Sequence, residues 1–217
     1  MLSPKKAFTL AEVLITLGII GVVAAMTIPG LITKIRDHHL RVAYKKTYSS
    51  LNQVMKFIEN EDITFDTKAG SSGPYNNPVI GEMFKYIATY YKAPTMCFDK
   101  NPDKCWVCER GEAAYILGGG APDWLGCNKE SYAFIDINGI AYYLYSNNEY
   151  PILIDVNGNR KPNQLGRDRF VLYFANSLEP NNHYPDSVNA VLPRKDIINK
   201  ERWCPQGNCL YKSWIHR

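Results

Sequence analysis

Three groups of residues in this sequence have types and spacings that suit chemistry. The first is Glu12, which stands at the head of a run without charged residues from Val13 to Thr33. The second is the segment DVNGNRKPNQLGRD, residues 155–168, which holds carboxylates and amides. These two groups suggest an ion pair at a membrane and a cation site made of oxygen ligands. The third group, six cysteines, suggests disulfides or a zinc site: Cys97, Cys105, Cys108, Cys127, Cys204 and Cys209.

Segment 155–168 has oxygen ligands at alternating positions, as calcium-binding loops do. Asp155, Asn157 and Asn159 alternate, and Asp168 is placed to close the cage. The EF-hand pattern fails, because an arginine and a glycine stand where that motif has its glycine and its terminal glutamate. These four residues are therefore candidate calcium ligands, although the adjacent bases Arg160, Lys161 and Arg167 oppose a cation. The competing interpretation is a long turn, rich in Asn and Gly, without an ion.

The six cysteines all lie beyond the apolar run, and their number is even. This pattern predicts disulfides formed in an oxidising compartment. A proline and a glycine favour a turn between Cys204 and Cys209, so a local bridge is expected there, with the other four cysteines paired among themselves. The alternative is a structural zinc site in which Cys105 and Cys108 join that pair as thiolate ligands.

No catalytic constellation accompanies these groups. The sequence contains no hydrolase elbow, Walker loop or zincin motif. The net charge of +4 is modest and no dense basic run stands apart, so the composition does not argue for a nucleic-acid partner. The sequence therefore predicts a protein that is not an enzyme.

The uncharged run is long enough to cross a bilayer, since its 21 residues make about 31 Å of helix. A cleaved secretion signal is one interpretation, with Lys5 and Lys6 before the run and small residues at 23–25 for the cut. A plain membrane anchor is another. More bases follow the run than precede it, which would place the C-terminal part in the cytoplasm, whereas the cysteines favour export.

A third interpretation explains more residues. The stretch KKAFTLAEVLITLGIIGVVAAMTIPGLI, residues 5–32, resembles the N-terminus of type IV pilins and type II secretion pseudopilins. The features in common are a short basic leader, a small residue before Phe8, an acid four positions later, and an apolar helix interrupted by Pro29. One departure is Ala7, where the family usually has glycine.

The resemblance implies a processing site and an assembly contact. Residues 1–7 would be a leader that a prepilin peptidase removes by cutting between Ala7 and Phe8, after which the new amine of Phe8 is methylated. Glu12 would pair with the Phe8 amine of a neighbouring subunit, which suits the cost of about 2.5–3.5 kcal/mol for a lone acid in a spanning helix. Pro29 is expected to kink or locally melt the helix.

The resemblance and the periodicity together predict an α+β pilin fold. Residues 8–33 form the transmembrane or filament-core helix, and the amphipathic helix 34–60 begins a head that extends to residue 217. A short helix is expected at 80–91. Period-two segments at 131–146, 150–156 and 169–175 predict a hairpin with Asn138-Gly139 at its tip and two more strands, hence three or four antiparallel strands.

The predicted function is structural. The chain would be a subunit of a type IV pilus-like or type II secretion pseudopilus filament, held before assembly as a single span in the inner membrane with its head outside the cytoplasm. Its implied partners are other pilin subunits, the prepilin peptidase, an assembly platform protein with its ATPase, and membrane lipid. The alternative is an exported or anchored binding module, such as a minor pilin adhesin with a head that binds DNA or glycan.

Overall fold

The computed structural model describes residues 9–61, 63, 78–98, 104–107, 132–144, 151–163, 167–175 and 190–193. The chain divides into two units, Met1–His39 and Leu40–Arg217. One helix, α1 (Leu10–Asn60), contributes to both units. We describe its two halves in turn.

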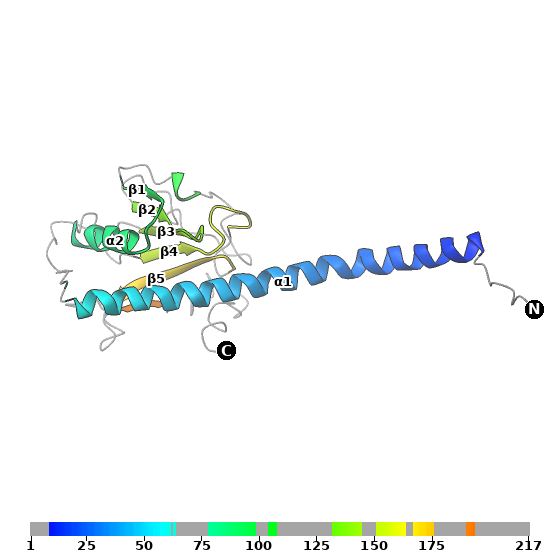
Figure 1. The fold of residues 1–217 in the computed structure, drawn as a ribbon, viewed down its shortest axis with the longest axis horizontal. Helices are drawn as coiled ribbons and strands as arrows, with labels where there is room; N and C mark the ends of the chain where they lie inside the picture. Colours follow the sequence, from blue (N-terminus) through cyan, green and yellow to red (C-terminus); the bar gives the residue numbers. More distant parts are fainter. Residues whose placement is uncertain are drawn as a thin grey trace, which may run out of the picture. The chain divides into compact units, whose positions relative to one another are not determined.

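The first half of α1 is an exposed apolar helix. Its large hydrophobic side chains, from Leu10 to Ile35, are all at least 44% exposed. The helix is continuous through Pro29 and Gly30 (Figure 1). The kink or local melting predicted at this proline in an assembled filament stays a prediction. Nothing in this half of the helix is packed as a protein core.

The second half of α1 packs one face into the head. The buried positions recur at steps of three and four, which is the period of one face of an α-helix, and this confirms the predicted amphipathic segment. Thr47 is the polar member of the face, and its hydroxyl donates to the carbonyl of Ala43 at 2.9 Å. The buried residues are Leu40, Tyr44, Thr47, Leu51, Val54, Met55 and Ile58.

The head contains a second helix, α2 (Pro78–Tyr90), and a six-stranded antiparallel sheet with the strands in chain order. The α+β class is confirmed. The four predicted strands are all present, and two short strands at the sheet edges bring the count to six. These two strands have three and four residues, and no Asn-Gly turn adjoins them in the sequence as one adjoins the equally short β2 and β3. The strands are β1 (Thr95–Cys97), β2 (Tyr132–Ile135), β3 (Ala141–Leu144), β4 (Pro151–Asp155), β5 (Arg169–Ala175) and β6 (Ala190–Pro193).

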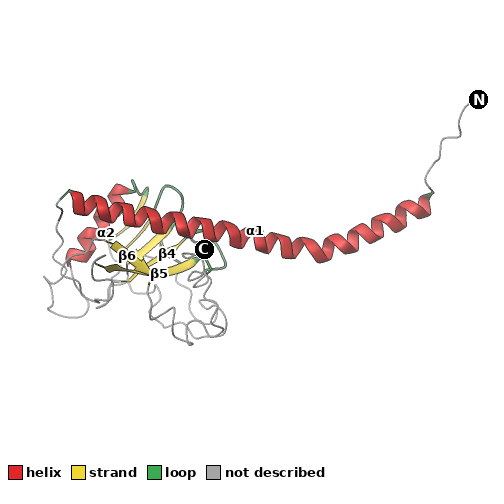
Figure 2. Ribbon diagram, turned by 90° about the horizontal axis from the view of Figure 1, so that it is seen from below, coloured by secondary structure: helices red, strands yellow, loops and turns green. Residues whose placement is uncertain are grey.

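Both faces of the sheet are buried. Helices α1 and α2 cover one face (Figure 2), where Tyr142 stacks on Phe134 at 4.5 Å between ring centres. The opposite face carries a smaller cluster, in which Tyr143 lies 5.4 Å from Trp106. Neighbouring tyrosines in β3 thus serve opposite faces, since side chains alternate along a strand. Packing on the two sheet faces accounts for these tyrosines.

The outer edge of β6 is covered by a side chain of α1. The Asn52 amide donates to the carbonyl of Val191 at 3.2 Å and accepts from its N–H at 3.1 Å. One side chain therefore satisfies both backbone groups of an edge residue, as a neighbouring strand would. This contact ties the helix to the last described strand.

The hairpin between β2 and β3 forms at the predicted position. The Asp136 N–H donates to Ile140 at 3.0 Å, which leaves three residues, 137–139, in the loop. Gly139 has φ +79°, as the last position of such a loop requires. The buried Asp136 carboxylate accepts from the N–H groups of Asn138 and Ile140 at 2.8 and 3.0 Å, which fixes the turn.

Candidate functional site

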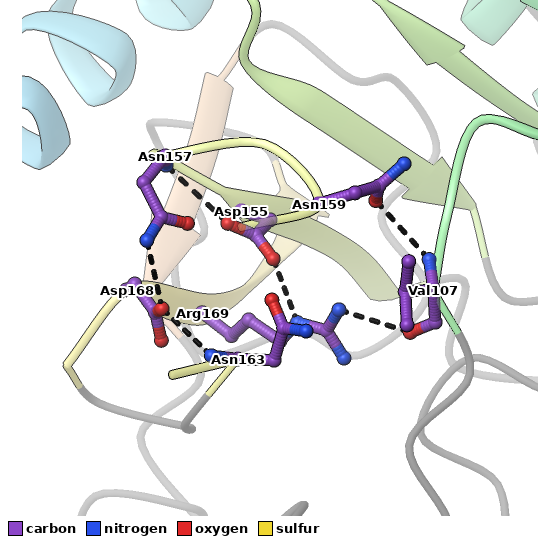
Figure 3. A network of polar contacts seen from close by, with 7 residues as sticks. All are labelled: Val107, Asp155, Asn157, Asn159, Asn163, Asp168 and Arg169. Atoms are coloured by element: carbon purple, nitrogen blue, oxygen red, sulfur yellow. Dashed lines mark hydrogen bonds and ion pairs between the residues drawn. The ribbon is translucent and has the colours of Figure 1, made fainter. Parts of the chain in front are cut away.

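The predicted calcium segment is built around a buried ion pair between two strands. Asp155 ends β4, Arg169 begins β5, and the two residues are directly paired across the sheet. The Arg169 Nε donates to the Asp155 Oδ2 at 2.8 Å (Figure 3), and the two side chains are 7% and 0% exposed. The positive charge of the Arg169 guanidinium therefore balances the negative charge of the Asp155 carboxylate.

Arg169 also holds a distant segment of the chain. Its Nη2 donates to the Val107 carbonyl at 2.9 Å, and its guanidinium carbon lies 4.5 Å from the centre of a Trp106 ring. The Val107 N–H in turn donates to the Asn159 side-chain oxygen at 3.1 Å. These contacts dock residues 104–107 on the sheet face that the helices leave open.

A second carboxylate, that of Asp168, accepts hydrogen bonds from residues of the loop between β4 and β5. The buried Asp168 accepts from the Asn163 N–H at 2.8 Å and from the Asn157 side-chain amide at 3.1 Å. The Asn157 N–H donates to Asp155 at 3.3 Å, so the loop links both acids. Figure 3 shows Asn159 turned away from this group toward Val107.

Three of the four predicted calcium ligands are thus brought together, and Asn159 is not. Among the described residues, no group of three or more His, Cys, Asp or Glu side chains is arranged to hold a metal ion. Both oxygens of Asp155 already accept hydrogen bonds, Oδ2 from Arg169 and Oδ1 from the Asn157 N–H. The residues present therefore fit an ion pair and a hydrogen-bonded loop better than a calcium cage.

Burial raises the pKa of Asp155 from its ordinary value of 3.8 to about 7. Desolvation is the main cause, the nearby Asp168 adds to it, and the charge and hydrogen bond of Arg169 oppose it. Asp155 is therefore a carboxyl group that titrates near neutral pH.

Calcium is expected to have no effect on the stability of the head, because Arg169 supplies the positive charge that Asp155 requires. Thermal unfolding of the detergent-solubilised chain, followed by circular dichroism, should give the same midpoint in millimolar calcium and in EDTA. A ligand that binds only the folded state raises the midpoint. A calcium-dependent rise of several degrees would therefore contradict this assignment and favour the predicted calcium site.

Gly158 allows the loop after β4 to lie against the β2–β3 hairpin. It has φ +67°, and a Cβ at this position would clash with the carbonyl oxygen of Gly139. Gly158→Ala is expected to lower the free energy of unfolding by about 2–3 kcal/mol, from strain in the left-handed region plus the clash. Chemical denaturation measures this change.

Gly139→Ala is the matched control for Gly158→Ala. Gly139 also has a positive φ, but an added Cβ there meets nothing within 4 Å. Only the conformational cost applies, so the loss should be about 1 kcal/mol. Equal losses in the two variants would show that the two loops do not need this close approach.

A disulfide anchors the same sheet face. Cys97 on β1 is bonded to Cys105, with 6.1 Å between their Cα atoms, and both residues are buried. This pairing lies within the predicted set of four cysteines. It excludes Cys105 as a thiolate ligand and so contradicts the alternative zinc site. The other candidate cysteines lie outside the described residues: Cys108, Cys127, Cys204 and Cys209.

The start of α1 shows what Glu12 contacts. The helix begins at Leu10, and the Glu12 carboxylate accepts from both the N–H and the hydroxyl of Thr9, at 2.9 Å each. The Thr9 hydroxyl oxygen accepts from the Glu12 N–H at 3.3 Å. These reciprocal bonds form a capping box, which satisfies donors that the first turn would otherwise leave unpaired.

The capping box places Glu12 at a helix N-terminus, where a negative charge is favoured by the helix dipole. The sequence analysis missed Thr9 as a functional residue, although the spacing T-x-x-E in TLAE is the signal for this motif. The predicted cleavage residues, Ala7 and Phe8, lie outside the described residues.

The helix that follows is long and apolar enough to cross a membrane by length and composition, and none of its most apolar window is buried. Residues 2–28 match the family model of the prokaryotic N-terminal methylation motif. The N-terminal segment is that of a type IV pilin-like protein. No curated protein and no solved structure matches the chain.

The motif and the fold together support a precursor of pilin or pseudopilin type. A methylation motif marks a precursor of pilin or pseudopilin type, which a prepilin peptidase processes and which assembles with other pilins. Such proteins are structural rather than enzymatic. The long apolar helix, the antiparallel sheet and the Cys97–Cys105 disulfide agree with a pilin-like α+β head.

Proposed function

We propose that this protein is a structural subunit of a type IV pilus-like or type II secretion pseudopilus filament. The observation that carries the proposal is the methylation motif at residues 2–28, on a helix whose apolar side chains are exposed up to Ile35. The same helix is packed into a folded head from Leu40 onward. A helix that is apolar and unpacked in the single chain is suited to lipid first and to neighbouring helices afterwards.

The precursor enters the inner membrane as a single span, with its head outside the cytoplasm. The Cys97–Cys105 disulfide supports this orientation, because such bonds persist in oxidising compartments. The prepilin peptidase removes residues 1–7 by cutting between Ala7 and Phe8, and the Phe8 amine is then methylated. Residues 8–33 become the filament-core helix, and residues 34–217 form the displayed head.

Assembly joins the apolar helices of successive subunits. Glu12 exchanges its intramolecular contact with Thr9 for the amine of a neighbouring Phe8, so that both charges are paired away from water. An assembly platform protein and its ATPase extract each subunit from the membrane. Pro29 and Gly30, which weaken the helix locally, are the positions where it adapts to neighbouring helices.

Immunogold electron microscopy with an antibody against the head tests this function. Labelled filaments are expected on cells that produce the chain, and they should be lost when its gene is deleted. Filaments that reach the cell surface would favour a pilus, and filaments confined to the periplasm a secretion pseudopilus. Label found only as dispersed single molecules in the membrane would contradict the proposal.

A further inference from the structure

Unpaired positive charge begins where the apolar run of α1 ends. Lys34 and Arg36 follow Thr33 directly, and both side chains are exposed. Within the described part of the chain, neither makes an ion pair or a side-chain hydrogen bond. Between Thr33 and Glu59 the only acid is Asp37, so this stretch of α1 has a strong excess of bases.

The helical rise places these two bases at a defined depth. At about 1.5 Å per residue, Lys34 and Arg36 lie within about 5 Å of Thr33 along the axis. The headgroup layer on each side of a bilayer core is about 5–8 Å thick. If the uncharged run fills the core, both bases fall inside this layer. Lys45 and Lys46, at about 18–20 Å, fall beyond it.

We propose that Lys34 and Arg36 bind the phosphate groups of anionic phospholipids at the surface where α1 leaves the membrane. The guanidinium of Arg36 offers a bidentate fork to phosphate, and Lys34 offers a compact point charge. The contact holds the subunit at a fixed depth until it is extracted. The inference rests on the proposed function in two respects, namely that residues 13–33 span the membrane and that the head lies outside the cytoplasm.

The charge pattern favours lipid over a second copy of the chain. Copies placed side by side at one height would bring the same unpaired bases together, and like charges repel. Membrane proteins usually keep an excess of bases on the cytoplasmic side. With the head exported, these bases lie on the opposite side. No ion-pair partner for Lys34 or Arg36 is found among the described residues, and phosphate groups of anionic lipids would supply the counter-charge.

Native mass spectrometry of the detergent-solubilised full chain tests the proposal, with dioleoyl phosphatidylglycerol and dioleoyl phosphatidylcholine as probes. The wild-type chain should retain the anionic lipid preferentially. In the double variant Lys34→Gln/Arg36→Gln, this preference should fall by about thirtyfold. The double variant Lys45→Gln/Lys46→Gln is the matched control, with the same charge change on the same helix, and it should keep the preference.

Equal retention of the two lipids by the wild-type chain would overturn the proposal. A loss in the control variant as large as in the Lys34/Arg36 variant would also overturn it, because the effect would then follow net charge and not depth. Dimers that form without lipid and disappear in the Lys34/Arg36 variant would favour a second copy as the partner. None of these results depends on cleavage or filament assembly, so failure here is distinct from failure of the proposed function.

Discussion

Glu12→Gln is expected to leave cleavage before Phe8 intact and to abolish assembly into filaments. Glutamine keeps the shape of the side chain but removes the charge that would pair with the Phe8 amine of a neighbouring subunit. An uncompensated amine in an apolar helix bundle is costly, since burying an unpaired charge costs several kcal/mol. Filament yield from sheared cells, measured beside the cleaved fraction on an immunoblot, reports both effects.

The structure supplies the control for this experiment, because Glu12 also caps α1 through Thr9. A glutamine at this position of a capping box still reaches the backbone N–H, so Glu12→Gln should keep the cap. Thr9→Ala removes the capping hydroxyl and keeps the charge. If Thr9→Ala abolishes assembly and Glu12→Gln does not, then capping is the role of Glu12 and the intersubunit pair is wrong.

Arg169→Met is expected to destabilise the head by about 3–5 kcal/mol at pH 8, the usual cost of breaking one side of a buried ion pair. The substitution leaves Asp155 buried without its counter-charge and frees the Val107 carbonyl. Chemical denaturation of the solubilised chain gives the free energy of unfolding. Arg160→Met is the matched control, because Arg160 lies in the loop that precedes β5 and is exposed.

The loss in Arg169→Met should depend on pH. At pH 5 Asp155 can remain buried as the neutral acid, because its pKa is raised to about 7, so the destabilisation should be smaller than at pH 8. A loss that is the same at pH 5 and pH 8 would show that Arg169 acts through packing on Trp106 rather than through charge.

Asp155 itself should contribute a pH dependence to the wild-type head. Its folded-state pKa lies above the unfolded value of 3.8, so the folded state binds the proton more tightly. The resulting stabilisation is present below pH 3.8 and is lost as the pH rises through about 7. Asp155→Asn stays neutral and should remove this decline between pH 4 and pH 8.

Much of the fold could be predicted because its signals are local. The buried face of α1 follows a helical period from Leu40 to Ile58, and Asn138-Gly139 marks the β2–β3 hairpin. The edge strands β1 and β6 could not be recognised, because no hairpin turn signal adjoins them. In addition, β6 is bonded to Asn52, which lies far away in the sequence.

The ion pair at the β4–β5 loop could not be predicted from the sequence. Alternating Asp and Asn residues at 155–159 suggested ligands, and neighbouring bases were counted only as opposing a cation. Arg169 was assigned only to a strand, yet it is the residue that pairs with Asp155 and holds Trp106 and Val107. Cross-strand register decides this pairing, and register depends on contacts that no local pattern encodes.

The N-terminal segment is the most predictable part, because its motif consists of residues that are contiguous in the sequence. The motif at residues 2–28 was recognised from its leader, Phe8, Glu12 and apolar helix. The role of Thr9 in capping the N-terminus of α1 was not predicted. The charge of Glu12 drew attention to distant partners, while its nearest partner stands three residues before it.

Mass analysis of the mature chain, purified from cell membranes, tests whether it is processed as a pilin precursor. The N-terminal peptide is expected to begin at Phe8 and to carry one methyl group on its amine. In cells without the prepilin peptidase the leader should not be removed, so the chain should start at or before residue 7. A mature chain that starts at Met26, after the small residues at 23–25, would contradict the account and show a cleaved secretion signal instead.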